Sequence, residues 1–388
     1  MWRKLMICAM AAFWICQVGN VCAQPVIGSA SGSFTHGATV GINGSSFGSK
    51  NPVQPKVWDP CNHNYQLSSR YSEVLPFHSA AGYNIAYRNA PFSSPSGSVI
   101  RAPHNYATQV IAGAHYPAVD GTYGWDKGNN VSLTAGNWGG STSFVLMYFY
   151  RIDPRFTGEN NASEGPNLKE FVANESTTSS YTGSYHYIDY CNDQVPMYSY
   201  PNGGWLKDTS TSPSCSGRTE PRIPNPMRTD VGADGDGWQH FEWQVKFGQG
   251  GFAKTYVDNA LVFNSSSGFQ NSFVVGSATI GGFSRVPTLD PTKAWRYFSD
   301  IYMDSTFSRV ILANNANYEL ATKKEPQIPT AWSNDSITFT VNLGKLPLGS
   351  TPYLFVFDSN NNHNPVGYQV QLPESSAPAP PAGLRIVP

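Results

Sequence analysis

The sequence has few charged residues: Asp, Glu, Lys and Arg make up 13% of its 388 residues, whereas they are about a quarter of an average globular domain. The 25 basic and 26 acidic residues also nearly balance. Binding to nucleic acid depends on clustered positive charge that neutralises phosphates, so this composition argues against such a partner. Ser, Thr, Asn, Gly and Tyr take the place of the charges, which is typical of a secreted all-β protein.

Long apolar runs are missing beyond the N-terminus, so the sequence predicts no membrane-spanning helix. At the N-terminus, Arg3 and Lys4 precede the apolar run 5–16, and small residues suited to cleavage end the segment. This pattern predicts that residues 1–23 are a signal peptide and that the protein is secreted or held at the cell surface. A lipid-modified Cys22 is the alternative.

Cysteine is scarce once residues 1–23 are set aside, because only Cys61, Cys191 and Cys215 remain. An odd number in an oxidising compartment predicts one disulfide and one leftover thiol. Cys191 and Cys215 bracket a Pro-, Ser- and Gly-rich excursion that a disulfide would close. Cys61 would then be buried and reduced, or paired outside the chain. No CxxC or HxxxH spacing accompanies these positions, so we expect no metal site there.

The common catalytic signatures are missing as well. Glycoside hydrolysis needs two carboxylates that flank one bond, and a single strand supplies them as ExDxE or ExDxxE because alternate residues share a face. The sequence has neither motif, and it has no Ser-His-Asp signature, P-loop or dinucleotide fingerprint. These absences argue against a hydrolase of that type and against a nucleotide-dependent enzyme.

Strand patterns are what the sequence has in abundance, and no window of twelve or more residues shows clear helical periodicity. Gly, Asn, Pro and Ser turns separate segments rich in β-branched and aromatic residues. The clearest of these segments are 143–153, 240–247, 253–263, 296–304, 309–314, 336–343 and 352–358. Many short strands with turn signals between them predict an all-β fold of the sandwich or jelly-roll kind.

Two stretches far apart in the sequence resemble the two halves of a TIG-type (IPT) immunoglobulin-like domain. The first half is carried by Ser31-Gly32, Gly37, Val40, Ile42, Gly44 and Phe47-Gly48. The second half is Trp332-Ser333-Asn334-Asp335-Ser336-Ile337-Thr338-Phe339-Thr340-Val341, followed by Leu346-Pro347-Leu348-Gly349. The resemblance implies that residues 24–52 and 306–372 form one smaller immunoglobulin-like sandwich, split by an insertion. Insertion at a surface loop with close ends disturbs a host domain little.

The inserted residues 53–305 resemble a concanavalin A-like, or laminin-G-like, jelly roll. Three stretches carry this resemblance: the strand 236–243, the hairpin 255–261 and the closing strand 297–304. The resemblance implies a fold rather than an activity, because the superfamily holds lectins, hydrolases, lyases and inert spacers. Residues 373–388 form a Pro- and Ala-rich tail that we expect to be extended.

Aromatic residues in loop-like settings are the candidates for ligand binding. Aromatic planes stack on sugar rings, and Asn, Asp and Gln complete the hydrogen bonding in a shallow groove. The candidates are Trp125, Trp138, Trp205, Tyr185, Tyr187 and Tyr198. The sequence therefore predicts recognition of a neutral or weakly charged glycan without catalysis, and packing of these aromatics into the sandwich is the alternative. A structural surface or matrix component is a further alternative.

A polysaccharide lyase is the enzymatic alternative. β-Elimination needs a group that neutralises a uronate carboxylate and a Tyr or His that moves the proton. Tyr187, His186 and His240 are the candidates, and alternation would place His240 on one polar strand face with Glu242. That face is either a groove or a solvated surface. The short motifs of jelly-roll alginate lyases, R-x-E-x-R, Q-I/V-H and Y-F-K-x-G, are absent, which disfavours this alternative.

Calcium is the metal that the sequence favours, if any. Asp230, Asp234 and Asp236 lie on a glycine-rich loop and would supply the oxygen ligands of a hard cation. The loop lacks the spacing and terminal Glu of an EF-hand. A plain Asp-Gly turn that leads into the strand at Trp238 is the alternative.

Overall fold

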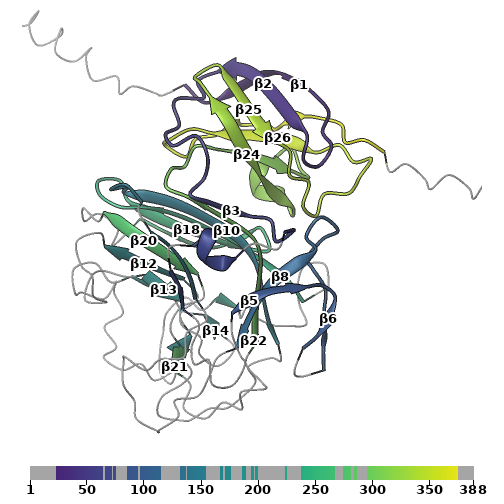
Figure 1. Ribbon diagram of the computed structural model, residues 1–388. Helices are drawn as coiled ribbons and strands as arrows, with labels where there is room; N and C mark the ends of the chain where they lie inside the picture. The colour runs from purple at the N-terminus through teal and green to yellow at the C-terminus, as the bar shows by residue number, and fades with distance from the viewer. Residues whose placement is uncertain are drawn as a thin grey trace, which may run out of the picture.

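The computed structural model is all-β, which confirms the predicted fold class. It describes residues 23–63, 66–71, 73–75, 85–94, 97–114, 132–136, 138–153, 167–168, 171–175, 186–188, 194–195, 197–199, 223–224, 237–266, 274–280, 284–285 and 295–374. Within these ranges the only helices are two 3₁₀ turns, η2 (Leu67–Ser69) and η5 (Tyr318–Leu320). The strands assemble into two units, the larger of which lies below the smaller in Figure 1.

The larger unit, which we call the large sandwich, consists of two antiparallel sheets. Its eight-stranded sheet has the order β19 (Ala260–Ser265), β18 (Phe252–Val257), β17 (Gln239–Lys246), β10 (Ser143–Asp153), β22 (Trp295–Asp304), β8 (Gln109–Ala114) and β5 (Ala86–Asn89), and β3 (Val57–Asp59) also pairs with β22. Its four-stranded sheet has the order β12 (Phe171–Glu175), β20 (Val275–Ile280), β9 (Ser132–Gly136) and β4 (Glu73–Leu75).

Four short pairs complete the large sandwich. They are β6 (Phe92–Ser93) with β7 (Val99–Ile100), β11 (Asn167–Leu168) with β21 (Ser284–Arg285), β13 (His186–Ile188) with β15 (Met197–Ser199), and β14 (Gln194–Val195) with β16 (Ile223–Pro224). The hydrophobic core lies between the two large sheets, because alternate residues of each strand point to one face. Leu146 and Tyr148 of β10, Trp243 of β17, and Leu133 and Ile280 of the smaller sheet are all buried in this core.

The smaller unit, which we call the small sandwich, is built from both ends of the described chain. Its seven-stranded sheet has the order β1 (Val26–Ser31), β2 (Thr39–Ser45), β25 (Ser336–Thr340), β24 (Lys324–Trp332), β23 (Arg309–Ala313), β26 (Tyr353–Phe357) and β27 (Tyr368–Gln369). Figure 1 shows β2 in purple beside β25 in yellow-green. Thr39 is the partner of Thr340 and Ile42 that of Ile337.

The small sandwich has its own core, to which β2, β23, β25 and β26 all contribute. Val40, Ile42, Leu312, Phe339 and Val356 belong to this core and are each 0% exposed. Strands from residues 39–45 and from residues 309–357 therefore bury their apolar faces against each other, although some 260 residues separate them in the sequence. The boundaries of the domains, and the tail at 373–388, stay predictions.

A third apolar cluster joins the two units. Val145, Met147 and Tyr302 point from the outer face of the eight-stranded sheet, which is the face opposite its core. They pack against side chains of the small sandwich, including Ile311 and Phe357. The small sandwich thus covers part of a sheet face that would otherwise be open to solvent.

Candidate functional site at the junction of the two sandwiches

The two faces of β17 are arranged as alternation predicts. Phe241 and Trp243 are in the core of the large sandwich, whereas His240 and Glu242 lie on the outer face of the sheet. The sequence predicts that the outer face at Glu242 is either a groove or a solvated surface. It is neither at this residue, because Glu242 is 0% exposed. The small sandwich covers it, which pattern alone could not reveal.

Glu242 is the centre of a buried polar network across the junction. Its carboxylate accepts hydrogen bonds from Arg309 Nη2 at 3.2 Å and Gln244 Nε2 at 2.6 Å. The hydroxyl of Tyr318 lies 3.1 Å from both of its oxygens. Burial disfavours the charged carboxylate, but the nearby Arg309 and Lys324 charges outweigh that effect and lower the pKa of Glu242.

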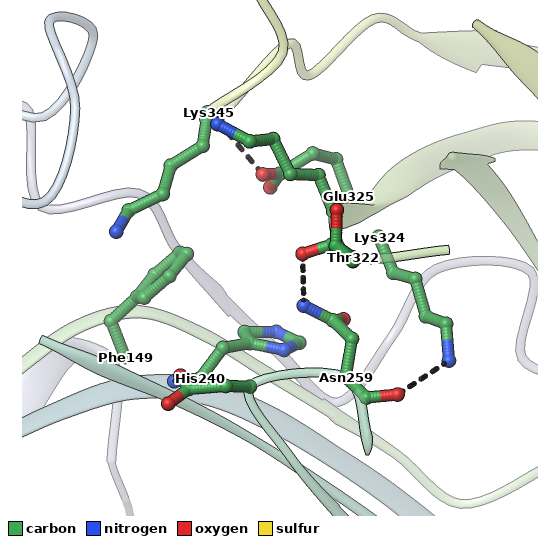
Figure 2. A pocket seen from close by; sticks show the side chains of 9 residues that line it. Phe149, His240, Asn259, Thr322, Lys324, Glu325 and Lys345 are labelled. Atoms are coloured by element: carbon green, nitrogen blue, oxygen red, sulfur yellow. Dashed lines mark hydrogen bonds between the residues drawn. The ribbon is translucent and has the colours of Figure 1, made fainter. Parts of the chain in front are cut away.

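Beside this network the outer face opens into a pocket between the two sandwiches. The large sandwich contributes Phe149, His240, Asp258 and Asn259, and the small sandwich contributes Thr322, Lys323, Lys324, Glu325 and Lys345. Figure 2 shows the ring of His240 between Phe149 and Asn259, with Glu325 and Lys345 across the pocket from it. A junction between two folded units is a common place for a small-molecule site.

The floor of the pocket is formed by two rings from neighbouring strands. The centroids of Phe149 on β10 and His240 on β17 are 5.0 Å apart, and their planes are tilted by 53°. Only 4% of Phe149 and 6% of His240 is exposed, so the floor offers a ligand little area. Burial lowers the pKa of His240 to about 4, which keeps the imidazole neutral at neutral pH.

One wall of the pocket is the hairpin turn between β18 and β19. Asp258 and Asn259 have φ of 47° and 65°, the left-handed conformation that two-residue hairpin turns require and that Asp and Asn tolerate. Asp258 Oδ1 accepts a hydrogen bond from the His240 main-chain N at 2.9 Å. Asn259 Nδ2 donates to the carbonyl oxygen of Thr322 at 2.7 Å, and this bond ties the turn to the small sandwich.

The other wall comes from the start of β24 and the loop after β25. Lys324 Nζ donates to the Asn259 carbonyl oxygen at 3.3 Å and lies 4.1 Å from the ring centroid of Tyr318. The carboxylate of Glu325 accepts from the Lys345 main-chain N at 2.8 Å. Lys345 Nζ lies 5.1 Å from the centroid of Phe149, so an ammonium group stands above the aromatic floor.

The structure places Trp138 differently from the exposed loop position that the sequence predicts. Trp138 is 2% exposed and belongs to the core of the large sandwich. Its Nε1 donates to the carbonyl oxygen of Ala135 at 2.6 Å, and its ring meets the edge of Phe144. Gly139 and Gly140, with φ of 67° and 80°, turn the chain directly after it. Flanking glycines therefore mark a tight turn here and not an exposed tryptophan.

Among the other candidates, two are hairpin neighbours. Tyr187 on β13 is the cross-strand partner of Tyr198 on β15, and His186 is that of Ser199. The predicted Trp125, Trp205, Tyr185, Cys191, Cys215, Asp230, Asp234 and Asp236 lie outside the described residues, so the aromatic, disulfide and calcium assignments that depend on them stay predictions.

Cys61 is a free thiol and is 1% exposed, which agrees with a buried, reduced cysteine. Burial raises its pKa well above the usual value. Within the described ranges, no group of three or more His, Cys, Asp or Glu side chains is arranged to hold a metal ion. In the same ranges, no helix has the length and apolar character needed to cross a membrane.

Sequence reasoning identified His240 but missed the rest of the pocket. The alternation of β10 places Phe149 on the outer face of the sheet, and this alternation is visible in the sequence. The Asp258-Asn259 turn was also visible as a hairpin signal. Nothing in the sequence connects these residues with Lys324 and Lys345, because only the docking of the two sandwiches brings them together.

Together these features define an all-β protein with a jelly-roll sandwich of antiparallel sheets and a second, smaller β-unit docked on its outer face. No protein-family model matches the sequence, and no curated protein matches it. The resemblance to a TIG-type domain therefore stays a prediction.

Distant similarity to solved structures concerns the fold alone. One is an endo-β-1,4-glucuronan lyase from the fungus Trichoderma reesei, with 14% identity, a TM-score of 0.40, and coverage of 65% of this chain and 96% of that chain. Another is the receptor-binding domain of botulinum neurotoxin type G, with 9% identity, a TM-score of 0.29, and coverage of 71% and 68%. The carbohydrate recognition domain of Emp46p has 12% identity, a TM-score of 0.29, and coverage of 46% and 80%.

Proposed function

We propose that this protein binds a saccharide without cleaving it, and that the pocket at the junction of the two sandwiches is part of the binding site. The observation that carries the proposal is the lining of the pocket. An aromatic floor of Phe149 and His240 is surrounded by the amide of Asn259, the hydroxyl of Thr322 and ammonium groups. Apolar rings with a few converging polar groups are what saccharide recognition needs.

The limited exposure of the floor determines how a saccharide would bind. Because Phe149 and His240 are 4% and 6% exposed, a ring substituent enters the pocket while the sugar ring lies over the rim. Thr322 is exposed, and Asp258 and Lys323 are half-buried, so these residues form the rim. The candidates Trp125 and Trp205 remain proposed platforms for further sugar units.

The contacts of the outer face favour binding over catalysis. The polar face of β17 is the place where the sequence locates a lyase groove, but there the Glu242 carboxylate is bonded to Arg309 and Gln244. A general base works best when its pKa is near the operating pH, and the pKa of His240 is about 4. A polysaccharide lyase stays the second candidate, because His240 and Lys345 line one pocket and are the residue types that β-elimination requires.

Glycan-array binding of residues 24–388, with and without Ca²⁺, tests the proposal. Thr322 is exposed at the mouth of the pocket, so Thr322→Trp should obstruct the mouth without disturbing the fold and should abolish binding. Thr330→Trp is the matched control, because Thr330 is also exposed and lies further along β24. We expect the control to bind as the unmodified chain does.

Failure of the unmodified chain to bind any neutral or acidic polysaccharide class would overturn the proposal. The lyase candidate is tested in the same samples by the ultraviolet absorbance of the unsaturated uronate that β-elimination produces. Growth of this absorbance, and its loss in His240→Gln, would replace binding with catalysis as the function. We also propose export of the chain by residues 1–23, which N-terminal sequencing of the secreted protein would test.

A further inference from the structure

The junction pocket concentrates positive charge on a chain that otherwise has little charge. Among the residues that the structure describes, three lysines line it, Lys323, Lys324 and Lys345, and two carboxylates do, those of Asp258 and Glu325. Asp258 accepts a hydrogen bond from the main-chain N of His240, so its charge is partly compensated locally. Glu325 is therefore a buried acid of the pocket whose charge state changes how positive the pocket is.

Glu325 is built into the pocket in an unusual way. It is 2% exposed, and its carboxylate accepts a hydrogen bond from Lys345 N at 2.8 Å. Gly344, with φ of 47°, passes so close that a Cβ at this position would overlap the carboxylate. The loop 342–345 thus wraps around the acid, and burial raises its pKa to about 7.

Other titratable groups face Glu325 from each packed element. His104, from the loop before β8, forms an ion pair with Asp300 on β22 at 2.9 Å. Burial lowers the pKa of His104, but Asp300 outweighs this effect and raises it. His104 favours the ionised form of Glu325, and Asp300 opposes it. The Lys345 ammonium also favours the ionised form. His240, Lys323, Lys324 and Asp258 complete the surroundings on the pocket side.

We propose that the pocket binds an oxyanion group, such as a carboxylate, sulfate or phosphate, and that Glu325 takes up a proton when this group binds. The inference rests on the proposed function for its biological ligand, an acidic substituent of a saccharide. An ionised Glu325 offsets the ammonium charge of Lys345 and repels an incoming anion. A protonated Glu325 removes that repulsion, and by reciprocity a bound anion raises the pKa of Glu325 further.

The size of the pH effect follows from this linkage. If Glu325 titrates near pH 7 in the free protein and stays protonated in the complex, affinity falls by about tenfold between pH 6 and pH 8. Lys345→Ala should weaken oxyanion binding at pH 6 by about tenfold or more, which is the usual effect of losing a charged hydrogen-bond donor. Glu325→Gln should bind as the unmodified protein does at pH 6 and should lose the pH dependence.

Isothermal titration of residues 24–388 with sodium sulfate, sodium glucuronate and glucose, at pH 6 and 8 and constant ionic strength, tests the inference. Repeating each titration in two buffers with different ionisation enthalpies measures the proton uptake. Lys246→Ala is the matched control, because Lys246 is six residues further along β17, roughly 20 Å from His240. We expect this control to leave binding unchanged, and thermal unfolding of each variant shows that it is folded.

The possible results separate the two claims. A pH dependence that persists in Glu325→Gln, or equal affinity for glucose and glucuronate, overturns the inference, although saccharide binding would stand. Binding of sulfate with the predicted pH dependence, but of no saccharide in the titrations or on the array, supports the anion site and overturns the proposed function. Absence of all oxyanion binding at pH 6 overturns the inference.

Discussion

Removing the charge of Glu242 should loosen the junction of the two sandwiches more than any surface substitution. Glu242→Gln keeps the size of the side chain but leaves the Arg309 guanidinium, which is 0% exposed, without its counter-charge. Breaking a buried ion pair by removing one partner costs about 3–5 kcal/mol of folding free energy. The hydroxyl of Tyr318 and the amide of Gln244 also lose a charged acceptor.

Urea denaturation at pH 7, followed by tryptophan fluorescence, measures this cost. The double variant Glu242→Gln, Arg309→Met should regain a large part of it, because a buried ion pair replaced by apolar groups is often close to neutral. Glu374→Gln, at an exposed position after β27, is the control and should change the free energy by less than about 0.5 kcal/mol. A cost below about 1 kcal/mol for Glu242→Gln would refute the argument that this network joins the sandwiches.

The same network predicts a pH dependence of known sign. The pKa of Glu242 is lowered in the folded state from an ordinary value of 4.5. Its contribution to the free energy of unfolding is therefore complete above pH 4.5 and is lost as the pH falls through the lowered pKa. Glu242→Gln lacks this acid-dependent loss, so the difference in free energy of unfolding between the unmodified protein and the variant should shrink as the pH falls below 4.5.

Three further predictions concern single residues. The pKa of His240 is about 4 in the folded protein, so this residue makes the free energy of unfolding rise by about 3 kcal/mol as the pH rises from about 4 to 6.5. The buried Glu325, whose pKa is raised, opposes this rise. Comparing the thermal midpoint of His240→Gln with that of the unmodified protein, at pH 4.5 and at pH 6.5, isolates the contribution of His240. Gly44→Ala should lower the thermal midpoint strongly, because the added Cβ would overlap the main-chain carbonyl of Val26 on the neighbouring strand β1. Gly28→Ala, on β1, should change the midpoint little, because the Cβ there would make only ordinary van der Waals contact. Cys61 should resist iodoacetamide in the folded protein and react with it after unfolding. Mass spectrometry of the Cys61 peptide measures the labelling, and equal labelling of the folded and unfolded protein would contradict this prediction.

The fold class and individual strands were predictable because alternation is a local property of the sequence. The segment 143–153 corresponds to β10, and the two faces of β17 separate as predicted, with Trp243 inside and His240 outside. The motif halves at residues 31–48 and 332–349 contain β2 and β25, which the structure pairs. Such long-range pairing was inferred from a resemblance and not from local pattern.

The candidate site was far less predictable, because its residues meet only through docking of the two sandwiches. A polar strand face reads the same whether solvent, ligand or another domain covers it, and at Glu242 the cover is the small sandwich. Trp138 shows the converse problem, since a tryptophan beside glycines was expected in a loop and is packed in the core. Neither outcome depends on the few residues on each side.

The comparison of Thr322→Trp with Thr330→Trp tests the central claim most directly. Both changes add the same bulk at exposed positions, but only the first lies at the mouth of the junction pocket. The account predicts that a saccharide bound by the unmodified chain is still bound by Thr330→Trp and is lost in Thr322→Trp. Equal binding by the two variants would contradict it and would place the saccharide site elsewhere on the molecule.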